Sequence, residues 1–286
     1  TARSCTALAV TWRIGIFRGT CRQYHGIGGH EEYLDECIEA AERCIDESPY
    51  QIYKGSQTPY RDLFSSNNAI STEVILARDY EIGLNIIHNA NNYTLSNTYG
   101  MPGLNKKIVD SYLKADGSRF TDVPGYATME FYQEMQDRDP RLTQTVRGPG
   151  YTRIGQTDRL SPDFSCSTTG YQLTKWVTDP SQDGYNKSYN DIILFRAAEV
   201  YLNFAEAKAE RGTLTQTDID KSIKPIRDRV GMPNLDMEEA NDNPDPYLTS
   251  DVTGYPHVSG ENKGVILEIR RERTIELIAE GHRYYD

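Results

Sequence analysis

Ile266-Leu-Glu-Ile-Arg-Arg-Glu-Arg-Thr-Ile-Glu-Leu-Ile-Ala-Glu-Gly-His-Arg-Tyr-Tyr-Asp286 closes the chain as an apolar segment interspersed with acidic and basic side chains. Helical spacing stacks Glu272, Glu276 and Glu280 on one side, and such a row of like charges destabilises a helix unless cations neutralise it. We therefore expect an ion-pair network that fixes the docking of this helix on another, rather than a catalytic acid pair. Its expected members are Arg227, Arg229, Glu272, Arg273, Glu276, Glu280 and Arg283.

The composition describes a polar globular chain. Its 286 residues are 37% hydrophobic, carry a net charge of −11 and have a mean hydropathy of −0.65. The negative charge argues against nucleic acid and anionic membrane surfaces as partners, because both require basic patches. No window approaches the about 18 uncharged apolar residues that a transmembrane helix needs. Five cysteines show no zinc-binding spacing and leave the redox compartment and the disulfide state open.

Tyrosine is unusually abundant, with 20 residues against 7 Phe and 2 Trp. A tyrosine ring has a flat apolar face and a polar tip, which suits the recognition of sugars, peptides or protein surfaces. Many of these rings are equally compatible with ordinary half-buried positions. The composition thus favours a binding protein without locating the site.

Helical periodicity appears at both ends of the chain. We expect helices over about 3–22 and 31–47, which form a hairpin within residues 1–48. A second hairpin is expected from helices over 191–211 and 217–230, with Pro225 kinking or delaying the latter. The alanine-rich first helix is typical of tetratricopeptide hairpins, because small residues let helix axes approach closely.

The intervening residues 49–190 have another character. They are dense in Asn, Gly, Pro, Ser, Thr and Tyr, with strand-like patterns at 71–79 and 171–177. An acidic, proline-bearing loop follows at 236–263, so residues 191–286 comprise a hairpin, this loop and the last helix. We expect a single, mainly α domain over 1–286, in which a tetratricopeptide-like scaffold carries a long irregular insertion with short β-strands.

Several motifs together resemble the C-terminal half of the SusD/RagB family of nutrient-binding outer-membrane lipoproteins from Bacteroidetes-type bacteria. They are Leu194-Phe-Arg-Ala-Ala-Glu-Val-Tyr-Leu-Asn-Phe-Ala-Glu-Ala207, Ile226-Arg-Asp-Arg-Val-Gly-Met-Pro233, Glu272-Arg-Thr-Ile-Glu-Leu-Ile-Ala-Glu-Gly-His-Arg-Tyr-Tyr-Asp286, Asp139-Pro-Arg-Leu142, Gly148-Pro-Gly150 and Thr169-Gly-Tyr-Gln-Leu-Thr-Lys175. Each motif alone is weak, but they occur in the family's order and span essentially the whole chain.

The resemblance implies a lipid-anchored protein on the extracellular face of the outer membrane. It would bind a glycan, or in some members a peptide, and deliver it to a SusC-like TonB-dependent transporter without a cofactor and without catalysis. The lipidated N-terminus and the first helical pairs of the family are absent, and the chain ends inside a family motif. We therefore expect a fragment, with the membrane anchor outside this chain.

Candidate ligand residues lie in three segments of the insertion. Glycan recognition combines aromatic faces with amide, carboxylate or guanidinium groups that bond sugar hydroxyls. The loop 89–99 is the first candidate, the segment 183–189 the second and the region of Tyr151 the third. The alternative for each is a loop that satisfies its own turns. The candidates are Asn92, Tyr93, Asn97, Tyr99, Tyr151, Arg153, Tyr185 and Tyr189, whereas Trp176 is interpreted as a structural residue.

Catalytic and metal motifs give little support for an enzyme. HExxH, GxSxG and phosphate-binding loops are missing from the sequence. A glycosidase needs only two carboxylates and stays open as a third hypothesis, behind a tetratricopeptide scaffold that binds only protein. Asp179, Asp183 and Asp191 are compatible with a structural calcium ion but lack the spacing of an EF-hand, and a solvated loop explains them equally.

Overall fold

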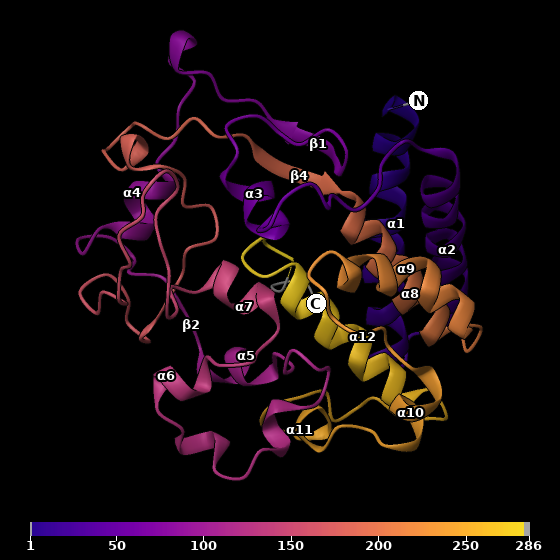
Figure 1. The fold of residues 1–286 in the computed structure, drawn as a ribbon. Helices are drawn as coiled ribbons and strands as arrows, with labels where there is room; N and C mark the ends of the chain where they lie inside the picture. The colour runs from indigo at the N-terminus through magenta and orange to yellow at the C-terminus, as the bar shows by residue number, and fades with distance from the viewer. Residues whose placement is uncertain (1, 283–286) are drawn as a thin grey trace.

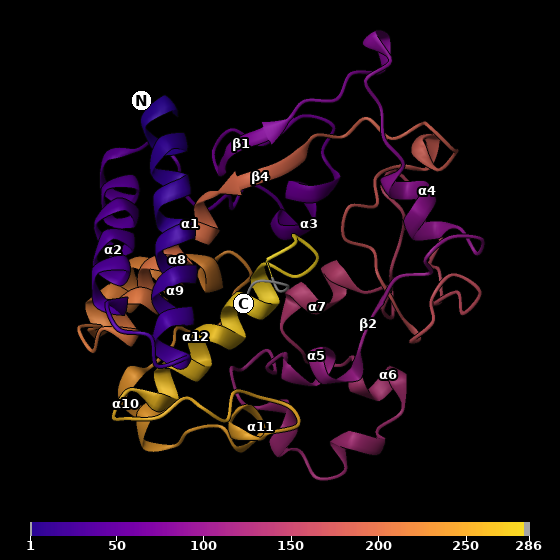
Figure 2. The same cartoon turned by 180° about the vertical axis from the view of Figure 1, so that it is seen from behind.

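The structure, a computed structural model, describes residues 2–282, and it is mainly helical as expected. Long helices occupy one side of the molecule and a loop-rich region with short helices occupies the other (Figure 1). The two sides are joined by a two-stranded ribbon and by the last helix, as the view from behind also shows (Figure 2). Within residues 2–282, no helix combines the length and the apolar character needed to cross a membrane.

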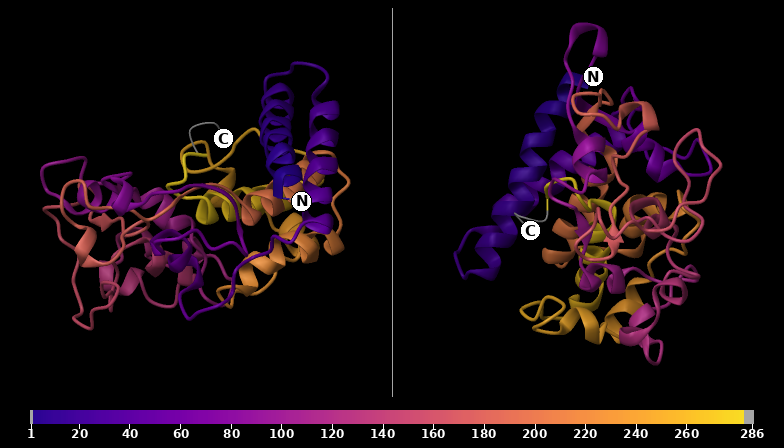
Figure 3. Two further views of the ribbon diagram at one scale, coloured as in Figure 1. Left: turned by 90° about the horizontal axis from the view of Figure 1, so that it is seen from above. Right: turned by 90° about the vertical axis from the view of Figure 1, so that its left-hand side faces the viewer.

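Helices α1 (Ala2–Tyr24) and α2 (His30–Glu47) form the N-terminal hairpin, which lies at one end of the molecule (Figure 3). Two glycines one helical turn apart allow their close contact. A Cβ at Gly15 would come within 2.8 Å of the Tyr33 carbonyl oxygen, and one at Gly19 within 2.5 Å of the Leu34 side chain. Side chains at either position would force the helices apart, so glycine sets their separation.

The second hairpin comprises α8 (Ala197–Glu210) and α9 (Gln216–Asp228). A capping box between Thr215 and Asp218 begins α9 by satisfying free backbone amides at its first turn. Pro225 lies inside α9 without ending it. The alanines of α8 are buried against neighbouring helices, which is the close packing that the sequence predicts for this segment.

The prediction that this helix begins near residue 191 is corrected by the structure. Ile192–Arg196 is strand β4, paired antiparallel with β1 (Val74–Arg78), which is the strand expected over 71–79. In the register of this ribbon, Phe195 lies opposite Leu76. β-Branched and aromatic side chains favour a strand when a partner is present, and that partner is more than a hundred residues away in the sequence.

The second sheet pairs only β2 (Gly103–Leu104) with β3 (Tyr171–Gln172). The strand expected over 171–177 is therefore much shorter. Trp176 adopts a left-handed conformation with a φ of 72°, which interrupts the extended backbone. Its ring packs on Phe64 with centroids 4.9 Å apart, and its indole nitrogen donates to the Ala279 carbonyl, which agrees with a structural role.

Short helices complete the insertion and the acidic loop. The insertion contains α3 (Pro59–Ser65), α4 (Ala90–Leu95), α5 (Lys106–Ser111), α6 (Phe131–Glu134) and α7 (Pro140–Thr145), with 3₁₀ turns at Ile82–Leu84, Phe120–Asp122, Tyr126–Thr128 and Pro180–Gln182. The acidic loop contains α10 (Met237–Asp242) and α11 (Pro246–Thr249). The last helix, α12 (Lys263–Glu276), lies between the helical side and the insertion (Figure 1).

Helix α12 organises the core because it is buried on nearly every side. Val265, Leu267 and Ile269 have no exposed surface and pack with residues from α8, α9, α10 and α11. Ile275 joins a separate apolar cluster with α5 and α7. Full burial of such a side chain contributes about 1.5–3 kcal/mol, so α12 holds both sides of the molecule together.

Candidate functional site

The carboxylates at the end of α12 lie in a buried ion-pair network. The carboxylate of Glu272 forms ion pairs with the guanidinium groups of Arg141 at 2.5 Å and Arg227 at 2.8 Å. The carboxylate of Glu276 forms ion pairs with Arg229 at 2.5 Å and Arg196 at 2.6 Å. Both arginines expected from the sequence thus contact the row of glutamates. Arg227 lies on α9, and Arg229 directly follows this helix.

Glu280 belongs to the same network although α12 ends before it. Its carboxylate lies 2.7 Å from Lys175 and 2.8 Å from Arg196. Arg273 has a different environment, because it contacts Glu206 and the side-chain oxygen of Asn203 on α8. Arg283 lies outside the described residues.

Further members of the network were missed from the sequence. Arg141 also pairs with Asp139 at 2.7 Å, and Glu73 lies 2.8 Å from Arg196 and 3.2 Å from Arg229. The only sequence signal for Arg141 is the Asp139-Pro-Arg-Leu142 motif, and Glu73 carried none. Long sequence separations concealed these pairs, since 131 positions separate Arg141 from Glu272.

Burial and charge oppose each other in this network. Burial alone would raise the pKa of each carboxyl group, but neighbouring cations reverse the effect. Arg196 and Lys175 lower the pKa of Glu280 to about 2. Arg141 and Arg227 likewise lower the pKa of Glu272. These carboxylates are ionised, fully paired and shielded from solvent, so the network is suited to holding the fold and not to contacting a ligand.

The first ligand segment is a short helix with a loop, rather than a loop throughout. Asn92 and Tyr93 lie on α4, and Tyr99 follows in the loop. The rings of Tyr93 and Tyr99 meet edge to face with centroids 4.7 Å apart, and the two residues are 50% and 40% exposed. Asn97 is also exposed. Two perpendicular rings at the surface can present both a stacking face and an edge to a bound molecule.

The structure brings the second candidate segment against the first. The side chain of Asn89 donates to the Asn186 side chain at 2.8 Å and accepts from the Asn186 backbone at 2.5 Å. The backbones of His88 and Ser188 exchange two hydrogen bonds. Tyr185 is exposed beside this junction in sequence, whereas Tyr189 is half-buried and lies 3.4 Å from the Asn67 amide.

Asp183 connects all three candidate segments. It accepts hydrogen bonds from Arg153 at 2.6 and 2.9 Å and from the Asn91 amide at 3.1 Å. Its backbone carbonyl accepts from Asn92 at 3.0 Å. Arg153 therefore holds Asp183, and through it α4 and the segment 183–189, in position. The charge of Asp183 raises the pKa of Arg153 against the opposing effect of burial.

Tyr151 does not reach the surface that carries Tyr93 and Tyr99. It is 7% exposed, and the guanidinium carbons of Arg61 and Arg147 lie 5.0 and 5.8 Å from its ring centroid. The sequence could not distinguish this buried ring from an exposed one, because its neighbours Gly150 and Thr152 carry no burial pattern. Tyr151 therefore packs inside the insertion as a structural residue.

The aspartates considered for calcium are engaged in local contacts. Asp179 accepts from the backbone of Ser181, and Asp191 accepts from the backbones of Ala69 and Tyr80. Among residues 2–282, no group of three or more His, Cys, Asp or Glu side chains is arranged to hold a metal ion. Asp183 is already paired with Arg153.

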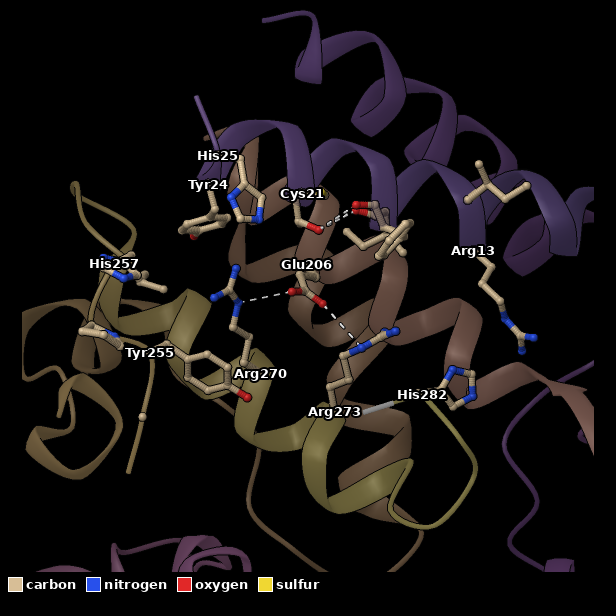
Figure 4. A pocket seen from close by; sticks show the side chains of 17 residues that line it. Arg13, Cys21, Tyr24, His25, Glu206, Tyr255, His257, Arg270, Arg273 and His282 are labelled. Carbon is tan, nitrogen blue, oxygen red and sulfur yellow. Dashed lines mark hydrogen bonds and ion pairs between the residues drawn. The ribbon is translucent and has the colours of Figure 1, made fainter. Parts of the chain in front are cut away.

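A cavity of about 920 Å³ lies between α1, α12 and the loop after α11 (Figure 4). Sequence reasoning did not identify it. Ile14 and Phe17 contribute apolar surface from α1, and Glu206 lies at its floor between Arg270 and Arg273. Because these charges are paired, the walls suit apolar groups better than a hydroxyl-rich ligand. None of the candidate ligand residues lines this cavity.

Comparisons with known proteins place this geometry in a family. The sequence profile of the SusD family matches residues 65–286, whereas no curated protein sequence matches the chain. A SusD-like carbohydrate-binding protein from Bacteroides fragilis superposes with a TM-score of 0.70 at 23% identity, covering 99% of this chain and 51% of that one.

Two further solved structures agree in fold. A second SusD-like protein from Bacteroides fragilis has a TM-score of 0.66 at 20% identity over 98% of this chain and 53% of its own. A SusD superfamily protein from Parabacteroides distasonis has a TM-score of 0.60 at 18% identity over 99% and 51%. The chain therefore spans about half the length of these structures. The match to the family profile shows that this chain belongs to the SusD family.

Proposed function

We propose that this chain binds an extracellular glycan, without altering it, on the surface formed by α4, the loop to Tyr99 and the segment 183–189. We call this the α4 surface. The observation that carries the proposal is the exposed, perpendicular pair of Tyr93 and Tyr99 on a framework tied together by Asp183. Carbohydrate binding by the Bacteroides fragilis structure of the same fold supports it.

The α4 surface has the chemistry that a glycan requires. Tyrosine faces pack on the C–H-rich faces of sugar rings, while amides bond their hydroxyl groups. The exposed side chain of Asn97 supplies such an amide on this surface. Fixed anchoring by Asp183 reduces the conformational entropy lost on binding.

We further propose that the full protein resides at the outer face of the outer membrane and passes its glycan to a SusC-like TonB-dependent transporter. Membership of the SusD family supports this role. Attachment to the membrane would depend on a lipid anchor. A peptide ligand, as in RagB-like proteins, and a scaffold that binds only protein are the competing outcomes.

Affinity gel electrophoresis on a panel of polysaccharides tests the proposal. We expect migration to be retarded by at least one glycan, and Tyr93→Ala and Tyr99→Ala to abolish the retardation. Tyr132→Ala is the matched control, because Tyr132 is 66% exposed and lies on α6. Retardation by none of the glycans, with binding to peptides instead, would favour the peptide alternative. Release of reducing sugar would contradict binding without catalysis.

A further inference from the structure

A second, smaller cavity of about 360 Å³ lies where the turns at 120–128 meet α11. Its volume is within the range of about 300–1,000 Å³ typical of small-molecule sites. In Figures 1 and 2, α11 lies at the lower edge of the molecule, well separated from α4 in the upper part of the loop-rich side. The residues that line it are Thr121, Asp122, Tyr126, Asp245, Pro246, Tyr247, Ser250 and Thr253.

Aromatic rings form part of the cavity wall. Tyr126 and Tyr247 meet edge to face with centroids 6.4 Å apart and planes at 81°. Phe120 packs on the other side of this cluster, with its centroid 5.9 Å from that of Tyr126. The wall therefore offers the same combination of ring face and ring edge as the α4 surface.

Tyr247 is held in place before any ligand arrives. Its hydroxyl donates to the Lys107 carbonyl at 3.0 Å, and its backbone amide donates to Asp245 at 2.7 Å. Asp245 is itself buried and paired with Arg271 of α12. A side chain that is already ordered loses little entropy on binding, so this ring is preorganised.

Several polar groups at the cavity have unused hydrogen-bonding capacity. Within residues 2–282, the Asp122 carboxylate and the hydroxyls of Thr121 and Tyr126 make no hydrogen bond or ion pair, although Asp122 attracts the buried guanidinium of Arg271 electrostatically. The Ser250 hydroxyl accepts from the Val252 backbone at 3.1 Å and keeps its own proton to donate. A carboxylate accepts from adjacent hydroxyl groups, while hydroxyls both donate and accept, which matches the pattern of a sugar ring.

We propose that this cavity is a second carbohydrate subsite, which binds one neutral hexopyranose unit over its tyrosines with Asp122 accepting from two sugar hydroxyls. The assignment of the ligand class rests on the proposed function, and the site itself is separate from the α4 surface. A sugar bearing its own carboxylate is disfavoured because it would face the charge of Asp122. Two separate subsites on one chain would increase the avidity for a long or branched glycan.

Amide chemical shifts of the ¹⁵N-labelled chain test this subsite. The probes are the methyl glycosides of glucose, galactose and mannose, with methyl glucuronide as the acidic comparator. At least one neutral glycoside is expected to shift the amides of Tyr126, Ser250 and Thr253, with a Kd on the order of 1 mM for so small a ligand. The glucuronide should shift them less at equal concentration.

Variants separate a built subsite from general surface binding. Tyr126→Ala and Asp122→Ala should each raise the Kd obtained from the shifts of Ser250 and Thr253 roughly tenfold. Tyr126→Phe preserves the packing on Phe120, so it should retain most of the binding. Shifts that are absent with all three neutral glycosides, or that persist unchanged in Tyr126→Ala, would overturn the proposal.

The same spectra distinguish this subsite from the α4 surface. Tyr93→Ala should leave the shifts at Ser250 and Thr253 unchanged while removing those around Asn92. If the α4 surface binds no sugar, shifts confined to Tyr126, Ser250 and Thr253 would still support the subsite. If only the amides around Asn92 respond, the proposed function stands and this subsite fails.

Discussion

Arg196 and Glu276 form a fully buried ion pair, 2.6 Å long, that joins the end of β4 to the last turn of α12. Arg196 also contacts Glu73 and Glu280. This one guanidinium therefore ties the β-ribbon, the helical side and the turn after α12 to a common point. The fixed position of the insertion relative to the scaffold depends on this connection.

Glu276→Gln should destabilise the protein strongly. The substitution keeps the volume but removes the negative charge that faces Arg196 and Arg229, and breaking a buried pair costs about 3–5 kcal/mol. The measurement is the free energy of unfolding from urea titration. Glu47→Gln is the control, because Glu47 forms an exposed pair with Arg43 at 3.8 Å. A loss for Glu276→Gln no larger than that of this control would contradict the importance of the network.

Acid should weaken the fold below about pH 4.5. The pKa values of Glu272, Glu276 and Glu280 are lowered in the folded state, so their contribution is fully present above the unfolded pKa and is lost as the pH falls toward the folded values. Glu280 alone, with a pKa of about 2 against an ordinary 4.5, accounts for roughly 3 kcal/mol.

The pH dependence is measured by urea unfolding at intervals between pH 7 and pH 2. Glu280→Gln should flatten this profile, because it removes one titrating group of the network. A stability that stays constant from pH 5 to pH 2 in the unaltered protein would show that the carboxylates do not carry these shifts.

Gly264→Ala should destabilise the protein although alanine is the better helix former. A Cβ at this position would lie 1.7 Å from the Ala240 carbonyl oxygen, so α10 and α12 would have to separate. Overpacking of this kind costs about 1–3 kcal/mol or more, which exceeds the gain of about 1 kcal/mol from helix propensity.

Gly28→Ala is the matched control for this substitution. No atom lies within 4 Å of the Cβ it would add, and Gly28 has no positive φ. Its thermal midpoint should change little or rise slightly. Equal midpoints for Gly264→Ala and the unaltered protein would mean that the two helices are farther apart than described.

Asp183→Ala should weaken glycan binding without removing an aromatic ring. The change releases Asn91 on α4 and Arg153 behind it, so α4 should become less ordered. Hydrogen exchange of residues 90–95 should accelerate, together with a several-fold loss of affinity. Asp158→Ala, at an exposed position elsewhere in the insertion, serves as the control. Unchanged exchange and affinity in Asp183→Ala would show that Asp183 does not position this surface.

The helices of the scaffold could be predicted because their apolar periodicity is a local property. The expected helices over 3–22 and 31–47 differ from α1 and α2 by only a few residues. Strand β4 was missed because Ile192–Arg196 also fits a helical pattern, and only its pairing with β1 selects the extended form.

The sequence predicted which residue types form the candidate site, but not how they are arranged in space. The clustering of Tyr93 and Tyr99 followed from their sequence proximity, but their support by Asp183 did not, since about 90 residues separate Asp183 from α4. Burial of Tyr151 and the partners of Glu276 also depend on tertiary contacts. Neither cavity had a sequence signal, because each is lined by segments distant in the chain.

Isothermal titration calorimetry tests the proposed function most directly. The ligand is an oligosaccharide of the glycan that retards the protein in affinity gel electrophoresis. The double variant Tyr93→Ala/Tyr99→Ala should bind at least tenfold more weakly than the unaltered protein, because it removes both exposed rings of the α4 surface. Tyr132→Ala should bind like the unaltered protein. An affinity of the double variant equal to that of Tyr132→Ala would contradict glycan binding at this surface.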